Sequence, residues 1–125
     1  MTTQAPDIEI YLLNCTREDI ESWLTSRFEA FQTGKHHYPI YNYSIHHHGH
    51  DIPVMLVENA AEKRFTSLWF NSAETPWPTD QACAEEVFAA LHCEVRCAPG
   101  GWQEGDEPDL WWRVNAQGEG LITWR

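Results

Sequence analysis

Two stretches of helical periodicity stand among short strand-like segments, and this alternation most constrains the fold. The first stretch has apolar residues at helical spacing: Ile20, Trp23, Leu24, Phe28 and Phe31. Thr16 precedes it as an N-cap, and Asp19 occupies the acidic position of a capping box. We therefore predict a helix over residues 16–32, with Gly34 as its stop.

A second helix is predicted over residues 79–91, after Thr79 or Asp80, with one apolar stripe formed by Ala84, Val87, Phe88 and Leu91. The remaining segments are rich in β-branched and aromatic residues or alternate in polarity, as strands do. These predicted strands cover residues 8–14, 38–48, 52–58, 65–71, 92–98, 110–115 and 121–124.

This order predicts one α+β domain over residues 1–125, with two helices and a mainly antiparallel sheet of six to seven strands. Two short segments resemble each other, LLNCT at residues 12–16 and WFNSA at residues 69–73, and this similarity points to a duplicated βαββ unit. The similarity covers only a few residues, and the loops of the two halves differ in length.

The chain is acidic, with 19 Asp and Glu against 8 Lys and Arg and a formal charge of −11. Binding to nucleic acid or to an anionic membrane needs clustered basic residues, so we expect neither. We expect a cytoplasmic protein, because we recognise no secretory signal and no apolar run of about 20 residues. The cysteines form no CxxC pair, and we expect reduced thiols that fill the core: Cys15, Cys83, Cys93 and Cys97.

Histidines gather in the predicted hairpin. On a strand, His46 and His48 would point to the same side, and His50 and Asp51 at the tip could approach them. Imidazoles with one carboxylate suit a divalent transition metal such as zinc. The tip is flexible in composition and offers no obvious partner to orient the rings, so we expect a solvated hairpin and no cofactor. A metal-binding or small-ligand protein, or a metal-dependent enzyme, is the alternative.

Enzyme signatures are missing from the sequence. It contains no GxSxG motif, no Ser-x-x-Lys motif and no glycine-rich phosphate loop. We therefore expect a protein that is not an enzyme.

The last notable segment is an acidic loop bordered by tryptophans. Its carboxylates are Glu104, Asp106, Glu107 and Asp109, and its bordering rings are Trp102, Trp111 and Trp112. Trp anchors many protein interfaces, and acidic groups steer a basic partner. We predict that Trp102, Trp111 and these four carboxylates bind a partner. Trp77 either forms a lip of the same surface or covers whichever of Trp111 and Trp112 does not pack beneath the helices. The alternative is a solvated loop whose tryptophans fold back on the core.

Together these features favour a small acidic protein-binding module, of the inhibitor, immunity or regulatory type, that engages a basic surface on a partner protein. A structural subunit of a larger assembly is a third hypothesis.

Overall fold

The structure is a computed structural model that describes residues 5–99 and 109–124. The two helices are α1 (Arg17–Arg27) and α2 (Asp80–Leu91). The strands are β1 (Ile8–Leu13), β2 (Ala30–His37), β3 (Ile40–His47), β4 (His50–Ala61), β5 (Phe65–Phe70), β6 (Val95–Cys97), β7 (Leu110–Asn115) and β8 (Gly118–Thr123).

The strands form one sheet in the order β2-β3-β4-β5-β1-β6-β7-β8, and every neighbouring pair is antiparallel. The predicted α+β class, the two helices and the antiparallel sheet are confirmed. The predicted strand count is wrong, because the sheet has eight strands rather than six to seven. The additional strand is β2. From the sequence, its residues were predicted to form the end of the first helix and the loop that follows it.

The first helix ends earlier than predicted. Phe28 is already extended, with φ −115° and ψ 161°, so the chain leaves α1 after Arg27. Phe31 then lies on β2, where its ring stacks on Tyr43 of β3 with 5.2 Å between centroids. Gly34 also lies within β2 rather than ending the helix. The apolar spacing that predicts a longer helix therefore comes from two different elements.

The starts of both helices follow the predicted capping chemistry. Thr16 Oγ1 accepts a hydrogen bond of 3.1 Å from the backbone N–H of Asp19. Thr79 Oγ1 accepts one of 3.1 Å from the backbone N–H of Ala82. These bonds fix where each helix begins.

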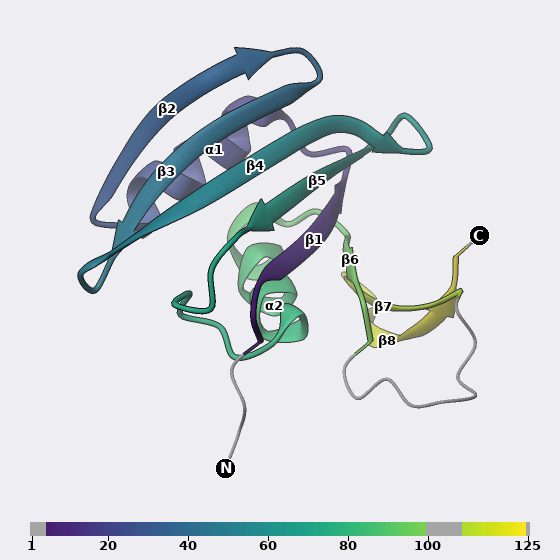
Figure 1. Cartoon of the computed structure of the whole chain (residues 1–125). Coiled ribbons are helices and arrows are strands. Elements are labelled where there is room, and N and C mark those ends of the chain that lie inside the picture. The colour runs from purple at the N-terminus through teal and green to yellow at the C-terminus, as the bar shows by residue number, and fades with distance from the viewer. Residues whose placement is uncertain (1–4, 100–108, 125) are drawn as a thin grey trace.

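Both helices pack on the same face of the sheet, α1 behind β2 and β3 and α2 beside β1 (Figure 1). The core lies between the helices and this face. Its largest fully buried side chains on that face and on α1 are Phe70, Ile8, Ile10, Leu12, Ile20, Leu24, Ile45, Ile52, Leu56 and Leu68. We call the opposite side, which neither α1 nor α2 covers, the open face.

The order of elements repeats, because a strand, a helix and three strands occur twice along the chain. The two halves enter the sheet differently, however. β6 pairs directly with β1, whereas β2, its counterpart after the first helix, lies at the far edge. The duplication therefore stays a prediction.

All four cysteines are free thiols, and Cys83 and Cys97 are fully buried in the core. Cys15 and Cys93 are half-buried at its edge. In the described part of the chain, neither helix has the length and apolar character needed to cross a membrane.

Candidate functional site

A cluster of aromatic rings covers part of the open face. Alternation along β1 places Tyr11 there, because Ile10 and Leu12 on either side face the core. Trp111 of β7 lies 5.5 Å from Tyr11 between ring centroids. Trp124, which follows β8, lies 5.7 Å from Tyr11 and 4.9 Å from Trp111. The interplanar angles of these three ring pairs are 88°, 85° and 69°, so each pair packs edge to face. We call Tyr11, Trp111 and Trp124 the aromatic corner.

A pocket of about 210 Å³ opens at the aromatic corner, and Ala60, Ala61 and Glu62 complete its lining. Glu62 Oε1 accepts a hydrogen bond of 3.0 Å from the indole Nε1 of Trp124. A carboxylate therefore lies at the edge of an otherwise apolar pocket. The volume is below the roughly 300 Å³ of small-molecule sites, so the pocket suits a single side chain.

One ring of the aromatic corner, Trp124, already holds a cation of this chain, together with the neighbouring ring of Phe65. The Arg96 guanidinium lies 4.7 Å from the Trp124 ring centroid and 4.8 Å from that of Phe65. Both distances are within the roughly 6 Å at which a cation is attracted to a ring face. Glu94 Oε2 accepts a hydrogen bond of 2.8 Å from Arg96 Nε, which helps to fix the guanidinium.

The structure separates the residues predicted to bind a partner. Trp111 lies in the aromatic corner, and the backbone O of Asp109 accepts a hydrogen bond of 2.9 Å from the Trp124 backbone N–H. Trp77 is only 3% exposed and lies on the helix side, where its ring stacks on Trp23. It is therefore no lip of the open face but part of the core. The other predicted residues, Trp102, Glu104, Asp106 and Glu107, lie outside the described residues.

The two adjacent tryptophans of β7 face opposite sides, as a strand requires. Trp112 packs against the core, and its Nε1 donates a hydrogen bond of 3.2 Å to Glu119 Oε1. Trp111 faces the other way and is covered by Tyr11 and Trp124. Tyr11, Glu62 and Trp124 were not predicted from the sequence. Of these, only Tyr11 carried a usable signal, its position between two apolar residues.

The histidine hairpin turns through His48 and Gly49, which have φ of 47° and 85°, and His47 pairs with His50 across the turn. The predicted ligands do not converge. His46 Nδ1 lies 3.0 Å from Asp51 Oδ1, while His50 Nε2 lies 3.5 Å from Glu74 Oε2.

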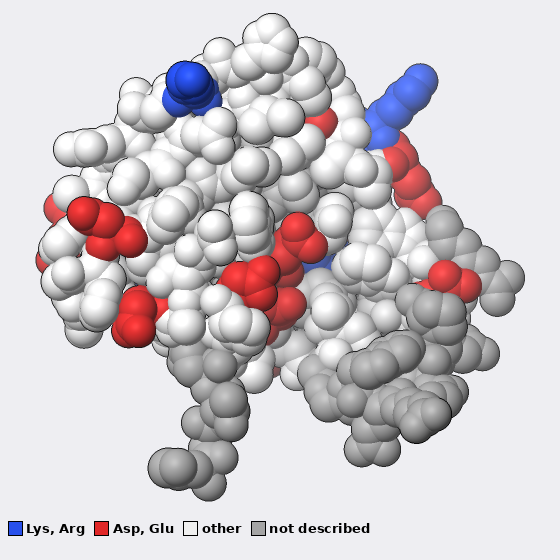
Figure 2. Space-filling view, viewed as in Figure 1, with Lys and Arg blue, Asp and Glu red and all other residues white. Residues whose placement is uncertain are grey.

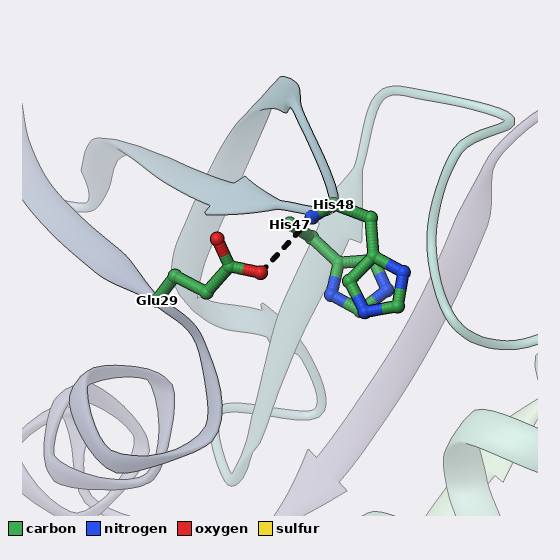
Figure 3. A group of neighbouring side chains, drawn as sticks. All are labelled: Glu29, His47 and His48. Atoms are coloured by element: carbon green, nitrogen blue, oxygen red, sulfur yellow. Dashed lines mark hydrogen bonds between the residues drawn. The ribbon is translucent and has the colours of Figure 1, made fainter.

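His48 instead stacks on His47, with 4.0 Å between the ring centroids and 19° between the planes. Figure 3 shows the carboxylate of Glu29 pointing toward these stacked rings. In the part of the chain that the structure describes, Glu29, His47 and His48 are the group with metal-ligand atoms mutually within 4.8 Å. Burial and the neighbouring His48 lower the pKa of His47, which favours its neutral ring. Glu29 and His47 were not predicted as ligands. Nothing in the sequence joins residue 29 to the hairpin, and strand alternation would turn His47 away from His46 and His48.

Acidic side chains are spread over the molecular face shown in Figure 2, with little basic surface between them. Some of the acids do not act as free surface charge. Glu86 is paired with Arg27, and Glu21 is bound by Arg17 and by the hydroxyl of Tyr43. Glu62 is the carboxylate that lines the pocket at the aromatic corner.

Compared with known proteins, the chain matches no family model, no curated protein and no solved structure at a significant level.

Proposed function

We propose that this chain is a protein-binding module that receives a basic side chain of a partner protein in the pocket of the aromatic corner. The observation that carries the proposal is the meeting of Tyr11, Trp111 and Trp124 around a pocket edged by the Glu62 carboxylate. Aromatic faces and a carboxylate together attract a Lys or Arg side chain. The net charge of −11 favours the approach of a basic surface over an acidic one.

The contact of Arg96 with Trp124 and Phe65 supports this choice of partner chemistry. It is an example, within the chain, of a guanidinium stacked on rings of the same face. A second guanidinium or an ammonium from a partner would use the same attraction at the neighbouring pocket.

The acidic loop belongs to this proposal as the part that steers the partner. Asp109 is tied through its backbone to Trp124, so this end of the loop lies next to the pocket. Glu104, Asp106 and Glu107 then raise the rate of encounter with a basic partner, and Trp102 adds an anchor. An inhibitor, immunity or regulatory protein of the cytoplasm would use such a surface, and free thiols suit that reducing compartment.

The pocket can be tested with Arg-rich and Lys-rich decapeptides as probes, compared with citrulline and acetyl-lysine versions that keep the shape and lose the charge. We expect the charged peptides to shift the indole N–H resonances of Trp111 and Trp124, and the neutral versions to leave them unchanged. Trp111→Ala should weaken binding about tenfold and Glu62→Gln about fivefold, through loss of a ring face and of the carboxylate.

Two variants control this experiment. Glu18→Gln removes an exposed carboxylate of α1, and Leu121→Ala removes an apolar side chain that is 56% exposed. Neither residue lines the pocket, so both variants should bind the peptides as the unmodified chain does. Equal binding by the charged and neutral peptides would exclude the proposed cation pocket.

The steering role of the loop has a separate test. Replacing Glu104, Asp106, Glu107 and Asp109 by amides should slow association with the basic peptides and flatten its dependence on salt between about 50 and 200 mM. The off-rate should change little. An unchanged association rate would remove the loop from the proposal and leave the pocket.

A further inference from the structure

The turn between β3 and β4 brings together three side chains that bind metals elsewhere in proteins. Glu29, His47 and His48 each offer one ligand atom, and these atoms all lie within 4.8 Å of one another. Two of the residues are adjacent in the hairpin, while the third comes from the segment between α1 and β2. The group is therefore made by the fold and not by one flexible tip.

Glu29 is held against the hairpin by two hydrogen bonds. Its backbone N–H donates to the His46 carbonyl at 3.2 Å, and its Oε1 accepts from the His48 backbone N–H at 3.2 Å. The second bond is drawn in Figure 3. Because both bonds use backbone groups of the hairpin, they place the carboxylate beside the two rings without depending on the protonation of either imidazole.

Neighbouring residues of a strand point to opposite sides, so the approach of His47 and His48 needs an explanation. His48 has left the strand and adopts φ of 47°, which turns its side chain toward that of His47. The ring of Phe28 meets the ring of His47 edge to face at 5.7 Å and limits its movement. The two imidazoles are thus presented to the same side.

We propose that Glu29, His47 and His48 bind one divalent transition metal ion, with Zn²⁺ as the ion that best matches two imidazoles and a carboxylate. Tetrahedral ligands at about 2.0–2.1 Å from zinc lie about 3.4 Å apart, so even ligand atoms at the 4.8 Å limit need to close by only about 1.4 Å. Glu29 and His48 are exposed and can make this movement by side-chain rotation.

Three protein ligands leave one position of a tetrahedral site for water or a small ligand. His47 and His48 also line an open groove of about 600 Å³, together with Arg27, His50 and Glu74. Solvent therefore reaches the metal, and the site exchanges ligands rather than serving as a closed structural centre.

This ligand set differs from one built on the hairpin tip alone. His46 Nδ1 is engaged with Asp51, and its Nε2 lies 3.9 Å from Glu29 Oε2. His50 is engaged with Glu74 across the groove. The two ligand sets therefore predict different effects of single substitutions.

The test is calorimetric titration of Zn²⁺ into the full chain, freed of metal by a chelator and carrying no affinity tag. We expect one ion per chain, and affinity losses of at least about tenfold for His47→Ala, His48→Ala and Glu29→Gln. His37→Ala on the exposed part of β2 is the matched control and should bind normally. His50→Ala and Asp51→Asn should change the affinity by less than about threefold, because neither residue is a ligand in the proposed set.

Cobalt(II) gives a second readout that does not depend on heat. Bound Co²⁺ in a four-coordinate site with two imidazoles should show visible absorption bands, and these should be lost in His47→Ala and His48→Ala and kept in His50→Ala. Unchanged far-UV circular dichroism of the metal-free variants would show that they remain folded. Zinc binding that survives both His47→Ala and His48→Ala, or that is lost equally in His50→Ala, would overturn the proposed site.

Discussion

Arg27 on α1 and Glu86 on α2 form an ion pair that joins the two helices, with 2.6 Å between Arg27 Nε and Glu86 Oε2. The other carboxylate oxygen, Oε1, accepts a hydrogen bond of 3.0 Å from the indole Nε1 of Trp77. Partial burial opposes the charge of Glu86, but the hydrogen bonds from Arg27 and Trp77 outweigh it and lower the pKa of this carboxyl. One charged group therefore connects both helices and the segment before α2.

Removing this charge should destabilise the chain at neutral pH. A lowered pKa means that Glu86 contributes stability above its ordinary value of 4.5, and that this contribution is lost as the pH falls through the folded-state pKa. We expect Glu86→Gln to lower the free energy of unfolding by about 1 kcal/mol at pH 7 and by less at pH 3. Urea denaturation at both pH values measures this. A double-mutant cycle with Arg27→Met should show coupling, and additive effects would contradict the pairing.

Asp80 has the opposite dependence on pH. Burial, together with the nearby acids Asp7 and Glu9, raises its pKa to about 6, although its Oδ1 accepts a hydrogen bond of 3.3 Å from the Glu9 backbone N–H. Because the folded-state pKa is raised, the contribution of Asp80 to stability is fully present below about pH 4 and is lost as the pH rises through about 6.

Asp80→Asn keeps an acceptor for the Glu9 N–H and removes the charge. We expect this variant to be more stable at pH 7.5 by about 1 kcal/mol, a modest gain because solvent screens a partly buried carboxyl. Thermal unfolding at pH 7.5 and pH 4 should show the gain only at the higher pH. Glu18→Gln, at a carboxylate with a 74% exposed side chain, should show no such gain.

The thiols should differ in reactivity. A hydrogen bond from Cys15 lowers the pKa of Cys93, whereas burial raises the pKa of Cys97 to about 12 and that of Cys83 well above its ordinary value. Since the thiolate is the nucleophile, we expect iodoacetamide at pH 7.5 to label Cys93 at least about tenfold faster than either buried thiol. Peptide mass spectrometry at increasing times measures the order. Cys15→Ala should slow the labelling of Cys93, and equal labelling rates would refute this assignment.

Trp77 should behave as a core residue. Its ring packs against those of Trp23, Phe28 and Phe70, with centroid distances of 6.1, 5.9 and 5.0 Å. Trp77→Ala should therefore lower the free energy of unfolding by about 3–5 kcal/mol. Trp111→Ala on the open face should cost less, because its ring is only partly covered. Chemical denaturation of the two variants side by side makes the comparison, and a smaller loss for Trp77→Ala would contradict the packing.

Local signals in the sequence predicted the helices, their caps and most strands, because Thr16, Thr79 and the apolar stripes act within a few residues. The edge strand β2 carries no such signal. Its side chains are almost all exposed, and it is defined by pairing with β3, which is a long-range property. For the same reason Phe31 looks like the next residue of a helical stripe until its contact with Tyr43 is known.

Residues of the candidate sites were predictable only where one segment supplies them. The histidine hairpin is visible in the sequence, but its third ligand, Glu29, comes from another element. Burial along β5 was not fixed by the sequence either. As a large aromatic residue within an apolar run, Trp69 suggests burial on the core side. The strand places Leu68 and Phe70 there instead, and the Trp69 indole Nε1 donates to Asp7 Oδ2 at 2.7 Å. A one-residue choice of register decides the face, and sequence alone does not fix it.

The position of β1 in the sheet has a consequence for folding kinetics. β1 comes first among the strands, yet it lies between β5 and β6, so its two ladders close loops that span much of the chain. The hairpin of β3 and β4 closes through two residues and needs no distant segment. Loop closure is slower and entropically more costly for distant strands, so we expect the β3–β4 hairpin to form early and β1 to be inserted late. Substitutions in β3 and β4 should then change the rate of folding, and substitutions in β1 mainly the rate of unfolding.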